Sequence, residues 1–269
     1  MAKNMTIYQI DAFTDRAFSG NPAGVCILQE PISAVMMQQL ATEMNISETA
    51  FVLRHNEVFD LRWFTPAVEV DLCGHATLAS AHILWEIGAS DFSETIRFSS
   101  RSGELRASRK GEWIELDFPV EPPRETEAPG PLLQALDVQP QWVGKNRFDY
   151  LVEVDSEERV RTMCPDFSLL VKVPCRGVIV TSAAHTGEYD FVSRFFAPAV
   201  GVDEDPVTGS AHCCLAPYWQ NKLGREPLTA FQASKRGGVL MVRVRDQRTF
   251  MSGKAVTVLK CELMKGAVS

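Results

Sequence analysis

The stretch Arg62–Asp71, RWFTPAVEVD, returns 132 positions later as Arg194–Asp203, RFFAPAVGVD. Seven of the ten positions are identical, and each copy is followed by a glycine and an apolar run. Solenoid repeats have shorter periods, of roughly 20–50 residues. The repeat therefore predicts two copies of one domain. Each copy is expected to contain a strand, a loop and a helix that begins at a glycine, Gly74 in one and Gly209 in the other.

The helix expected after the first copy runs from His75 to about Ile87 and is apolar on nearly every side. A surface helix shows a single apolar stripe, so other elements are expected to enclose this one. Earlier in the chain, Ser33 is expected to cap a helix that reaches about Met44. Alternating strand patterns outnumber helices in both halves, which favours an α+β fold with many antiparallel strands.

The segment 119–131, PVEPPRETEAPGP, separates the two halves. It holds five prolines, which fix φ and lack a backbone donor, so neither helix nor sheet is expected to continue through it. It predicts a boundary between a first domain, residues 1–120, and a second domain, residues 121–255.

Composition excludes several classes of partner. The 269 residues carry a net charge of -7 without a basic block, which excludes nucleic acid. No apolar stretch approaches the roughly 20 residues of a spanning helix, and the N-terminus lacks the apolar core of a signal peptide, so no membrane contact is expected. Seven cysteines, an odd number, indicate reduced thiols and a cytoplasmic location.

The two predicted helix starts, at Gly74 and Gly209, suggest what the protein binds. Each offers backbone N–H groups and the positive end of a helix dipole. If a pseudo-twofold axis relates the copies, both starts face one cleft and form a receptor for a small carboxylate. An acidic protein can bind an anion in this way because the field is local.

Three polar clusters, Ser47–Phe51, Cys73–His75 and Asp205–Ser210, are candidates for chemistry. Together they supply two carboxylates, an imidazole and a hydroxyl, which suit acid/base catalysis. Asn21 and Ser47 are candidates for positioning a substrate, although an asparagine after a glycine is equally typical of a turn. The chain has no CxxC or HExxH spacing, so no metal is expected.

Over essentially its whole length the chain resembles the PhzF-like (phenazine biosynthesis-like) isomerases of the diaminopimelate epimerase superfamily. The matching motifs are YQIDAFT (8–14), FSGNPAGV (18–25), SETAFV (47–52), RWFTPAVEVDLCGHAT (62–77) and DEDPVTGSAH (203–212). The resemblance implies two similar domains, each a β-barrel-like mixed sheet around a central helix, with the active site in the cleft between them. It also implies a homodimer and a terminal strand, within residues 256–269, that completes the first domain.

The resemblance assigns roles to particular residues. It implies that Glu48 is the general acid/base, with His75 and Asp205 as catalytic partners. Ser210 is expected to contact the substrate, and the backbone at Gly74 and Gly209 is expected to bind its negative charge. The implied reaction is a proton shift on a small carboxylate-bearing metabolite, without a metal or an organic cofactor.

One departure from the wider superfamily bears on the mechanism. Its racemases use two cysteines, whereas this chain has Cys73 in the first loop and Thr208 at the second position. A single carboxylate base therefore fits better than two thiols. Two alternatives stay open: an amino- or imino-acid epimerase or racemase that uses Cys73, and a non-catalytic ligand-binding protein on the same fold.

Overall fold

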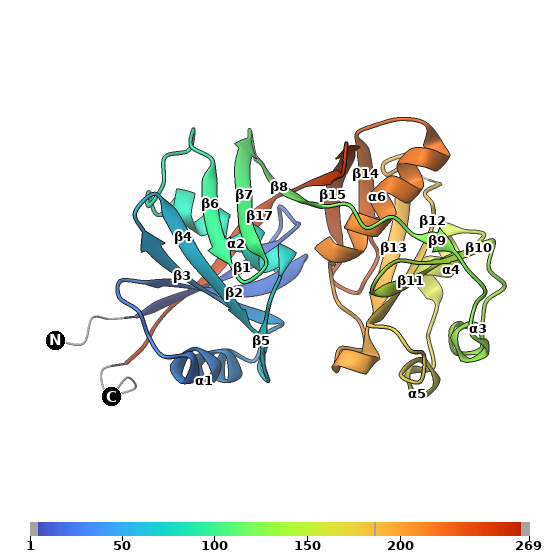
Figure 1. Cartoon of the computed structure of the whole chain (residues 1–269), viewed down its shortest axis with the longest axis horizontal. Coiled ribbons are helices and arrows are strands. Elements are labelled where there is room, and N and C mark those ends of the chain that lie inside the picture. Colours follow the sequence, from blue (N-terminus) through green and yellow to red (C-terminus); the bar gives the residue numbers. More distant parts are fainter. Residues whose placement is uncertain (1–4, 186, 265–269) are drawn as a thin grey trace. The chain divides into compact units, whose positions relative to one another are not determined.

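A computed structural model describes residues 5–185 and 187–264. The chain divides into two compact units (Figure 1). Unit 1 comprises the described residues up to Asp117 together with those from Ser252 onward, and unit 2 runs from Phe118 to Met251. The two copies of the repeated stretch lie in different units.

Unit 1 contains a mixed sheet in the order β17-β1-β2-β3-β4-β6-β7-β8, with β5 paired to β4. Neighbours are antiparallel except for the parallel pairs β2–β3 and β4–β6. The strands are β1 (Thr6–Ala12), β2 (Asn21–Leu28), β3 (Glu48–His55), β4 (Val58–Phe64), β5 (Glu69–Val70), β6 (Ile96–Ser100), β7 (Gly103–Lys110), β8 (Trp113–Pro119) and β17 (Ala255–Glu262). The helices are α1 (Ala34–Met44) and α2 (Gly74–Glu86).

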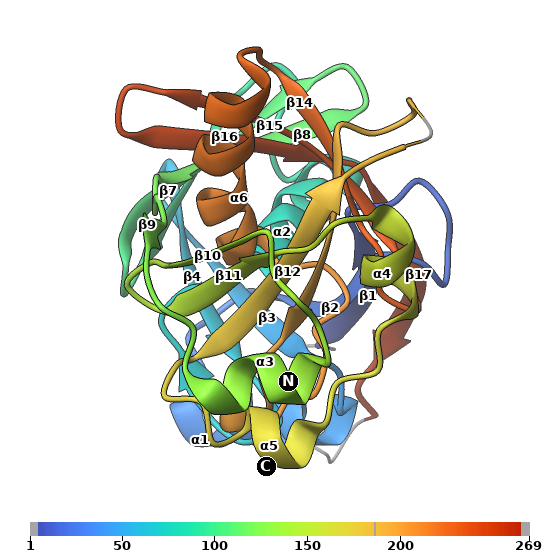
Figure 2. The ribbon, with the colours of Figure 1, turned by 90° about the vertical axis from the view of Figure 1, so that its right-hand side faces the viewer.

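Unit 2 contains a second mixed sheet, β9-β10-β11-β12-β13-β14-β15. The strands are β9 (Arg124–Glu125), β10 (Trp142–Lys145), β11 (Asp149–Glu153), β12 (Gly177–Ala183), β13 (Phe191–Phe196), β14 (Leu228–Gln232), β15 (Gly238–Arg245) and β16 (Arg248–Gly253). The helices are α3 (Gly130–Leu136), α4 (Glu157–Thr162), α5 (Phe167–Leu170) and α6 (Gly209–Leu223), and Pro198–Val200 forms a 3-10 turn. Figure 2 shows α3 and α5 side by side at one end of the unit.

The two sheets follow the same plan. From β1 to β7 and from β10 to β15, the pairings run antiparallel, parallel, antiparallel, parallel, antiparallel. Parallel neighbours need a crossover connection. α1 and α2 supply these crossovers in unit 1, whereas α4 with α5, and then α6, supply them in unit 2. The predicted α+β fold built from two similar domains is therefore confirmed at the level of topology.

The repeated stretch has the same structural role in both units. It begins on β4 or β13, and each copy's arginine forms a two-pronged ion pair with a glutamate further along the loop. Arg62 Nε lies 2.7 Å from Glu69 Oε1, and Arg194 Nε lies 2.6 Å from Glu204 Oε1. Paired N–H···O bonds of this kind fix the orientation of both side chains. The shared arginine thus holds the loop that leads to α2 or α6.

The predicted enclosure of α2 is confirmed. Ten of its thirteen residues are buried, and it packs against β1, β2, β3 and β17. α1 packs Met37 and Leu40 against Cys26 and Phe51 of the same sheet. Since successive strand residues point to opposite faces, the buried neighbours of Cys26 and Phe51 face away from α1. Both faces of the central strands are therefore covered.

The proline-rich segment 119–131 is more structured than the sequence predicted. Arg124 and Glu125 form β9, which pairs with β10, and α3 already begins at Gly130. Arg124 and Glu125 are not prolines and keep their backbone N–H groups, so they can form a two-residue ladder with β10. In the part of the chain that the structure describes, no helix combines the length and the apolar character needed to cross a membrane.

Candidate active site

The first predicted cluster lies in unit 1, where β3 and α2 begin. α1 ends at Met44, its C-cap Asn45 adopts a left-handed conformation with φ of 49°, and β3 then begins at Glu48. The loop after β4 leads into α2, whose N-cap is Cys73 and whose second residue is His75. A strand start and a helix start therefore position a carboxylate, a thiol and an imidazole.

These three side chains are in direct contact. The Glu48 Oε2 atom lies 3.1 Å from His75 Nε2. The Cys73 Sγ atom lies 3.5 Å from His75 Nδ1 and 3.9 Å from Nε2. The His75 side chain is 6% exposed and the Glu48 side chain 20%, so solvent reaches the cluster from the carboxylate side. Two of the three predicted catalytic residues thus form an ion pair.

The surroundings set the charges of this cluster. Burial disfavours a charged imidazole, but the Cys73 sulfur and the Glu48 carboxylate outweigh it, so the pKa of His75 lies well above its ordinary value. Burial and the Glu48 carboxylate raise the pKa of the Cys73 thiol. Both shifts favour protonated forms, the imidazolium for His75 and the thiol for Cys73.

Two predicted substrate-positioning residues adjoin the first cluster. Asn21 begins β2 and is fully buried, and its Oδ1 accepts a hydrogen bond of 3.3 Å from the Ser47 hydroxyl. Ser47 directly precedes Glu48, so this bond ties the start of β3 to the start of β2. Gly74 is the first residue of α2. A role for these residues toward substrate stays a prediction.

The third predicted cluster, Asp205–Ser210, lies in unit 2, at the start of α6. Thr208 is the N-cap of this helix, and its hydroxyl donates a 2.5 Å hydrogen bond to Asp205 Oδ2. Gly209 and Ser210 form the first turn. The Asp205 side chain is therefore held by Thr208, and the predicted pairing of Asp205 with His75 stays a prediction.

Gln232, at the end of β14, is a residue that sequence reasoning missed. It is fully buried, and its Oε1 accepts a 2.8 Å hydrogen bond from the Thr208 N–H. Its Nε2 donates to the Asp205 carbonyl at 2.8 Å and to Thr208 Oγ1 at 3.2 Å. One amide thus fixes both ends of the Asp205–Thr208 turn. The sequence around Gln232 carries no motif that signals this role.

His212 was also missed as part of this cluster. Its Nδ1 lies 2.8 Å from the Thr208 carbonyl, and it is fully buried beside Phe191. Burial lowers the pKa of His212 to about 4. The neutral ring therefore donates from Nδ1 and braces the first turn of α6.

Glu48, Cys73 and His75 are also a possible metal-ligand set. Each offers one ligand atom, and these atoms all lie within 4.8 Å of one another. Cys73 and His75 lie on one segment and Glu48 on another, so no local spacing in the sequence identifies the set.

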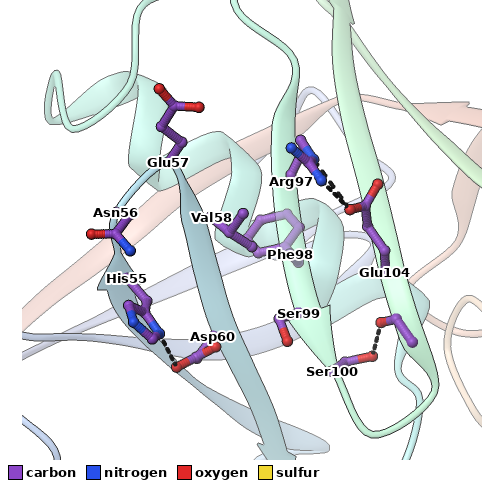
Figure 3. Close-up of a pocket in the computed structure, with 11 residues that line it drawn as sticks. His55, Asn56, Glu57, Val58, Asp60, Arg97, Phe98, Ser99, Ser100 and Glu104 are labelled. Atoms are coloured by element: carbon purple, nitrogen blue, oxygen red, sulfur yellow. Dashed lines mark hydrogen bonds and ion pairs between the residues drawn. The ribbon is translucent and has the colours of Figure 1, made fainter.

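A pocket of about 710 Å³ in unit 1 lies elsewhere, along β4, β6 and β7 (Figure 3). None of the predicted site residues lines it. Four of its lining side chains lie in two close pairs: His55 Nδ1 lies 3.8 Å from Asp60 Oδ2, and Arg97 lies 2.5 Å from Glu104. Exposed pairs of this kind are typical of a solvated surface.

Comparison with known proteins relates this geometry to a family. The model of the phenazine biosynthesis-like proteins, PhzC-PhzF, matches residues 10–261. An uncharacterized isomerase of Halalkalibacterium halodurans is 56% identical over 96% of this chain and 98% of its own length. A crystal structure of a PhzF family protein from Enterococcus faecalis is 40% identical with a TM-score of 0.94, covering 97% of this chain and 100% of that one.

A likeness in fold alone extends further. A predicted epimerase of Pseudomonas aeruginosa superposes with a TM-score of 0.75 at 21% identity, over 97% of this chain and 99% of the other.

Proposed function

Since the chain belongs to the phenazine biosynthesis-like family and is an isomerase, we propose that it shifts a proton on a small carboxylate-bearing metabolite, with Glu48 as the general acid/base. The observation that carries this proposal is the shielded contact of 3.1 Å between Glu48 Oε2 and His75 Nε2. A carboxylate held beside a proton donor in a partly dry site suits the removal and return of a proton.

In the proposed reaction, Glu48 takes a proton from a carbon next to an activating group and becomes a neutral acid. The electron pair left on the substrate delocalises as enolate-like charge, which the His75 imidazolium stabilises. Glu48 then returns the proton to another carbon of the same π-system. One group removes and returns the proton, and the proposed reaction includes no metal or organic cofactor.

The unit 2 cluster has a proposed role in the same reaction. Ser210 and the backbone at Gly209 lie in the first turn of α6, where N–H groups and the helix dipole favour an anion. We assign them, with Gly74 of α2, to the substrate carboxylate. Asp205, fixed by Thr208, serves as a second acid/base group.

The thiol alternative is less well supported. A racemase thiol must lose its proton readily to act as a base, but burial raises the pKa of Cys73. A Cys73→Ala variant that lost all proton exchange while Glu48→Gln kept it would favour the epimerase or racemase that uses Cys73.

The proposal is tested by the Glu48→Gln variant in deuterated water. Small carboxylates with an acidic C–H are screened by NMR for deuterium incorporation, and exchange and turnover should fall by about 10²–10⁴-fold in the variant. Glu86→Gln is the matched control, because Glu86 also pairs with a histidine of unit 1, His82, at 2.9 Å, but its side chain is 47% exposed. Unchanged exchange in Glu48→Gln would overturn the role of Glu48, and ligand binding without exchange in the parent would favour the non-catalytic alternative.

Two further proposals rest on the sequence and the family resemblance. We propose that the protein works as a homodimer, which sedimentation of the full chain tests. We also propose a cytoplasmic location, on the odd number of cysteines.

A further inference from the structure

A second pocket, of about 350 Å³, lies in unit 2 between two strands and the last turns of α6. Its volume is within the range of small-molecule sites, about 300–1,000 Å³. None of the residues assigned to the proton shift lines it. The residues that line it are Gln141, Trp142, Glu153, Tyr218, Asn221 and Lys222.

One wall of this pocket is aromatic. Trp142 of β10 is paired directly with Glu153 of β11, so both side chains lie on the same face of the sheet. Gly144, two positions after Trp142, lies on that face too. A Cβ atom at Gly144 would come within 2.0 Å of the Trp142 ring, so the indole needs this glycine in order to lie over β10. The Tyr218 ring packs against the indole, with ring centroids 4.8 Å apart and planes tilted by 36°.

The carboxylate of the pocket is already occupied by two donors. Glu153 is only 4% exposed. The Tyr218 hydroxyl donates a 2.5 Å hydrogen bond to its Oε2, and the Lys222 ammonium forms an ion pair with its Oε1. Burial and the Glu153 carboxylate raise the pKa of Tyr218, which keeps the hydroxyl protonated as a donor. Glu153 therefore fixes the positions of Tyr218 and Lys222.

The charged group most available to a ligand is the Lys222 ammonium. Its side chain is 45% exposed, and its three N–H donors exceed the one that the ion pair with Glu153 needs. Gln141 and Asn221 are exposed and add side-chain amides. An anion can therefore meet Lys222 beside the aromatic wall, whereas a cationic ligand would have to displace Lys222 from Glu153.

We propose that this pocket binds a small aromatic carboxylate, whose ring packs against Trp142 and Tyr218 and whose carboxylate pairs with Lys222. A neutral aromatic molecule or an aliphatic carboxylate satisfies only half of the site. The site is separate from the proposed proton shift and does not depend on it, so a protein without isomerase activity would still bind such a ligand.

The test follows Trp142 and needs no activity assay. The indole N–H signal of Trp142 is recorded by ¹H–¹⁵N NMR of the full-length protein and identified by its loss in Trp142→Phe. Benzoate is titrated to about 10 mM, a range that covers weak ligands, and should shift this signal in a saturable way. Acetate, which lacks the ring, and benzyl alcohol, which lacks the charge, should each bind about 10-fold or more weakly.

Lys222→Met removes the ammonium and keeps most of the aliphatic side chain. Benzoate affinity should fall by about 10-fold or more, because a hydrogen bond to a charged group contributes at least that factor. Lys145→Met is the matched control. The Lys145 ammonium also lies over a tyrosine ring of unit 2, 4.6 Å from the Tyr150 centroid, but Lys145 does not line the pocket, so benzoate affinity should not change.

The proposal is overturned if benzoate leaves the Trp142 signal in place, or if Lys222→Met keeps the parent affinity. If Lys222→Met fails to fold because Glu153 loses its cation, the probes decide in the parent: equal affinities for benzoate and benzyl alcohol would overturn the proposal. Ser210→Ala, in the proposed carboxylate site of α6, should leave the benzoate response of Trp142 unchanged. Loss of the response in Ser210→Ala would show that the signal reports that site, which also overturns the proposal.

Discussion

Replacing Gln232 by methionine should loosen the Asp205–Ser210 cluster while nearly preserving side-chain volume. The amide of Gln232 holds the Thr208 N–H and the Asp205 carbonyl at 2.8 Å each, and it is fully buried. Methionine fills the space but can replace neither bond. The turn that presents Asp205 and begins α6 should therefore lose its main anchor to β14.

The size of the effect follows from the two backbone groups left without a partner. Each buried polar group that loses its hydrogen bond costs about 1–3 kcal/mol, so the free energy of unfolding of unit 2 should fall by roughly 2–6 kcal/mol. Relaxation of the turn favours the lower end. Domains are stable by about 5–15 kcal/mol, so the variant should still fold.

The assay combines urea unfolding with hydrogen exchange read by mass spectrometry. Peptides that cover residues 205–212 should lose protection in Gln232→Met, whereas peptides around Glu48 in unit 1 should not change. Turnover should fall at temperatures where the variant is folded, since the turn that carries Asp205 loses its Gln232 anchor. The matched control is Gln220→Met: Gln220 also bridges to backbone, at Val244, but it is only half-buried, so water can replace its bonds.

Equal destabilisation and equal protection in the two glutamine variants would refute this reasoning. Loss of protection around Glu48 as well as around Asp205 would show a general loosening of the protein. That result would contradict the role of Gln232 as a local anchor of the Asp205–Thr208 turn.

Two predictions concern pH. Against the effect of burial, Cys73 and Glu48 raise the pKa of His75. The interactions of the protonated ring therefore stabilise unit 1 fully below about pH 6.5, and this contribution is lost as the pH rises through the raised pKa. Urea titrations across this range should show the alkaline loss in the parent and not in His75→Gln. Burial lowers the pKa of His212 to about 4, so its contribution to stability has the opposite pH dependence. This contribution is fully present above about pH 6.5, and roughly 3 kcal/mol of it is lost as the pH falls toward about 4. His212→Asn, which keeps a donor for the Thr208 carbonyl, should be less acid-sensitive, and an unchanged acid profile would contradict the assignment.

Features with a local pattern were predictable from the sequence. Ser33 accepts a 3.2 Å hydrogen bond from the Met36 N–H and caps α1, as its position before an amphipathic run indicated. α2 is enclosed because its residues are apolar on every side, and α6 begins at the glycine that the repeat predicted. The duplication was visible because it preserves an arginine that forms a similar ion pair in both units.

Features that depend on tertiary contacts were not predictable. The alternation of parallel and antiparallel pairs follows from where each crossover helix packs, which strand patterns do not encode. The 3.1 Å contact between Glu48 and His75 joins residues 27 positions apart, and family resemblance rather than spacing associated them. Gln232 was missed because a buried glutamine that bonds a backbone turn looks, in the sequence, like any polar residue at a strand end.

The most direct test of Glu48 as a single base is the fate of the proton it removes. An accepted substrate, deuterated at the reacting carbon, is turned over in ordinary water, and the product is analysed by NMR and mass spectrometry. A single carboxylate predicts that part of the deuterium reappears at the second carbon, on the same face, and that Glu48→Gln forms product about 10²–10⁴-fold more slowly. Complete loss of the label with delivery from the opposite face, or product formation by Glu48→Gln at the parent rate, would contradict the account.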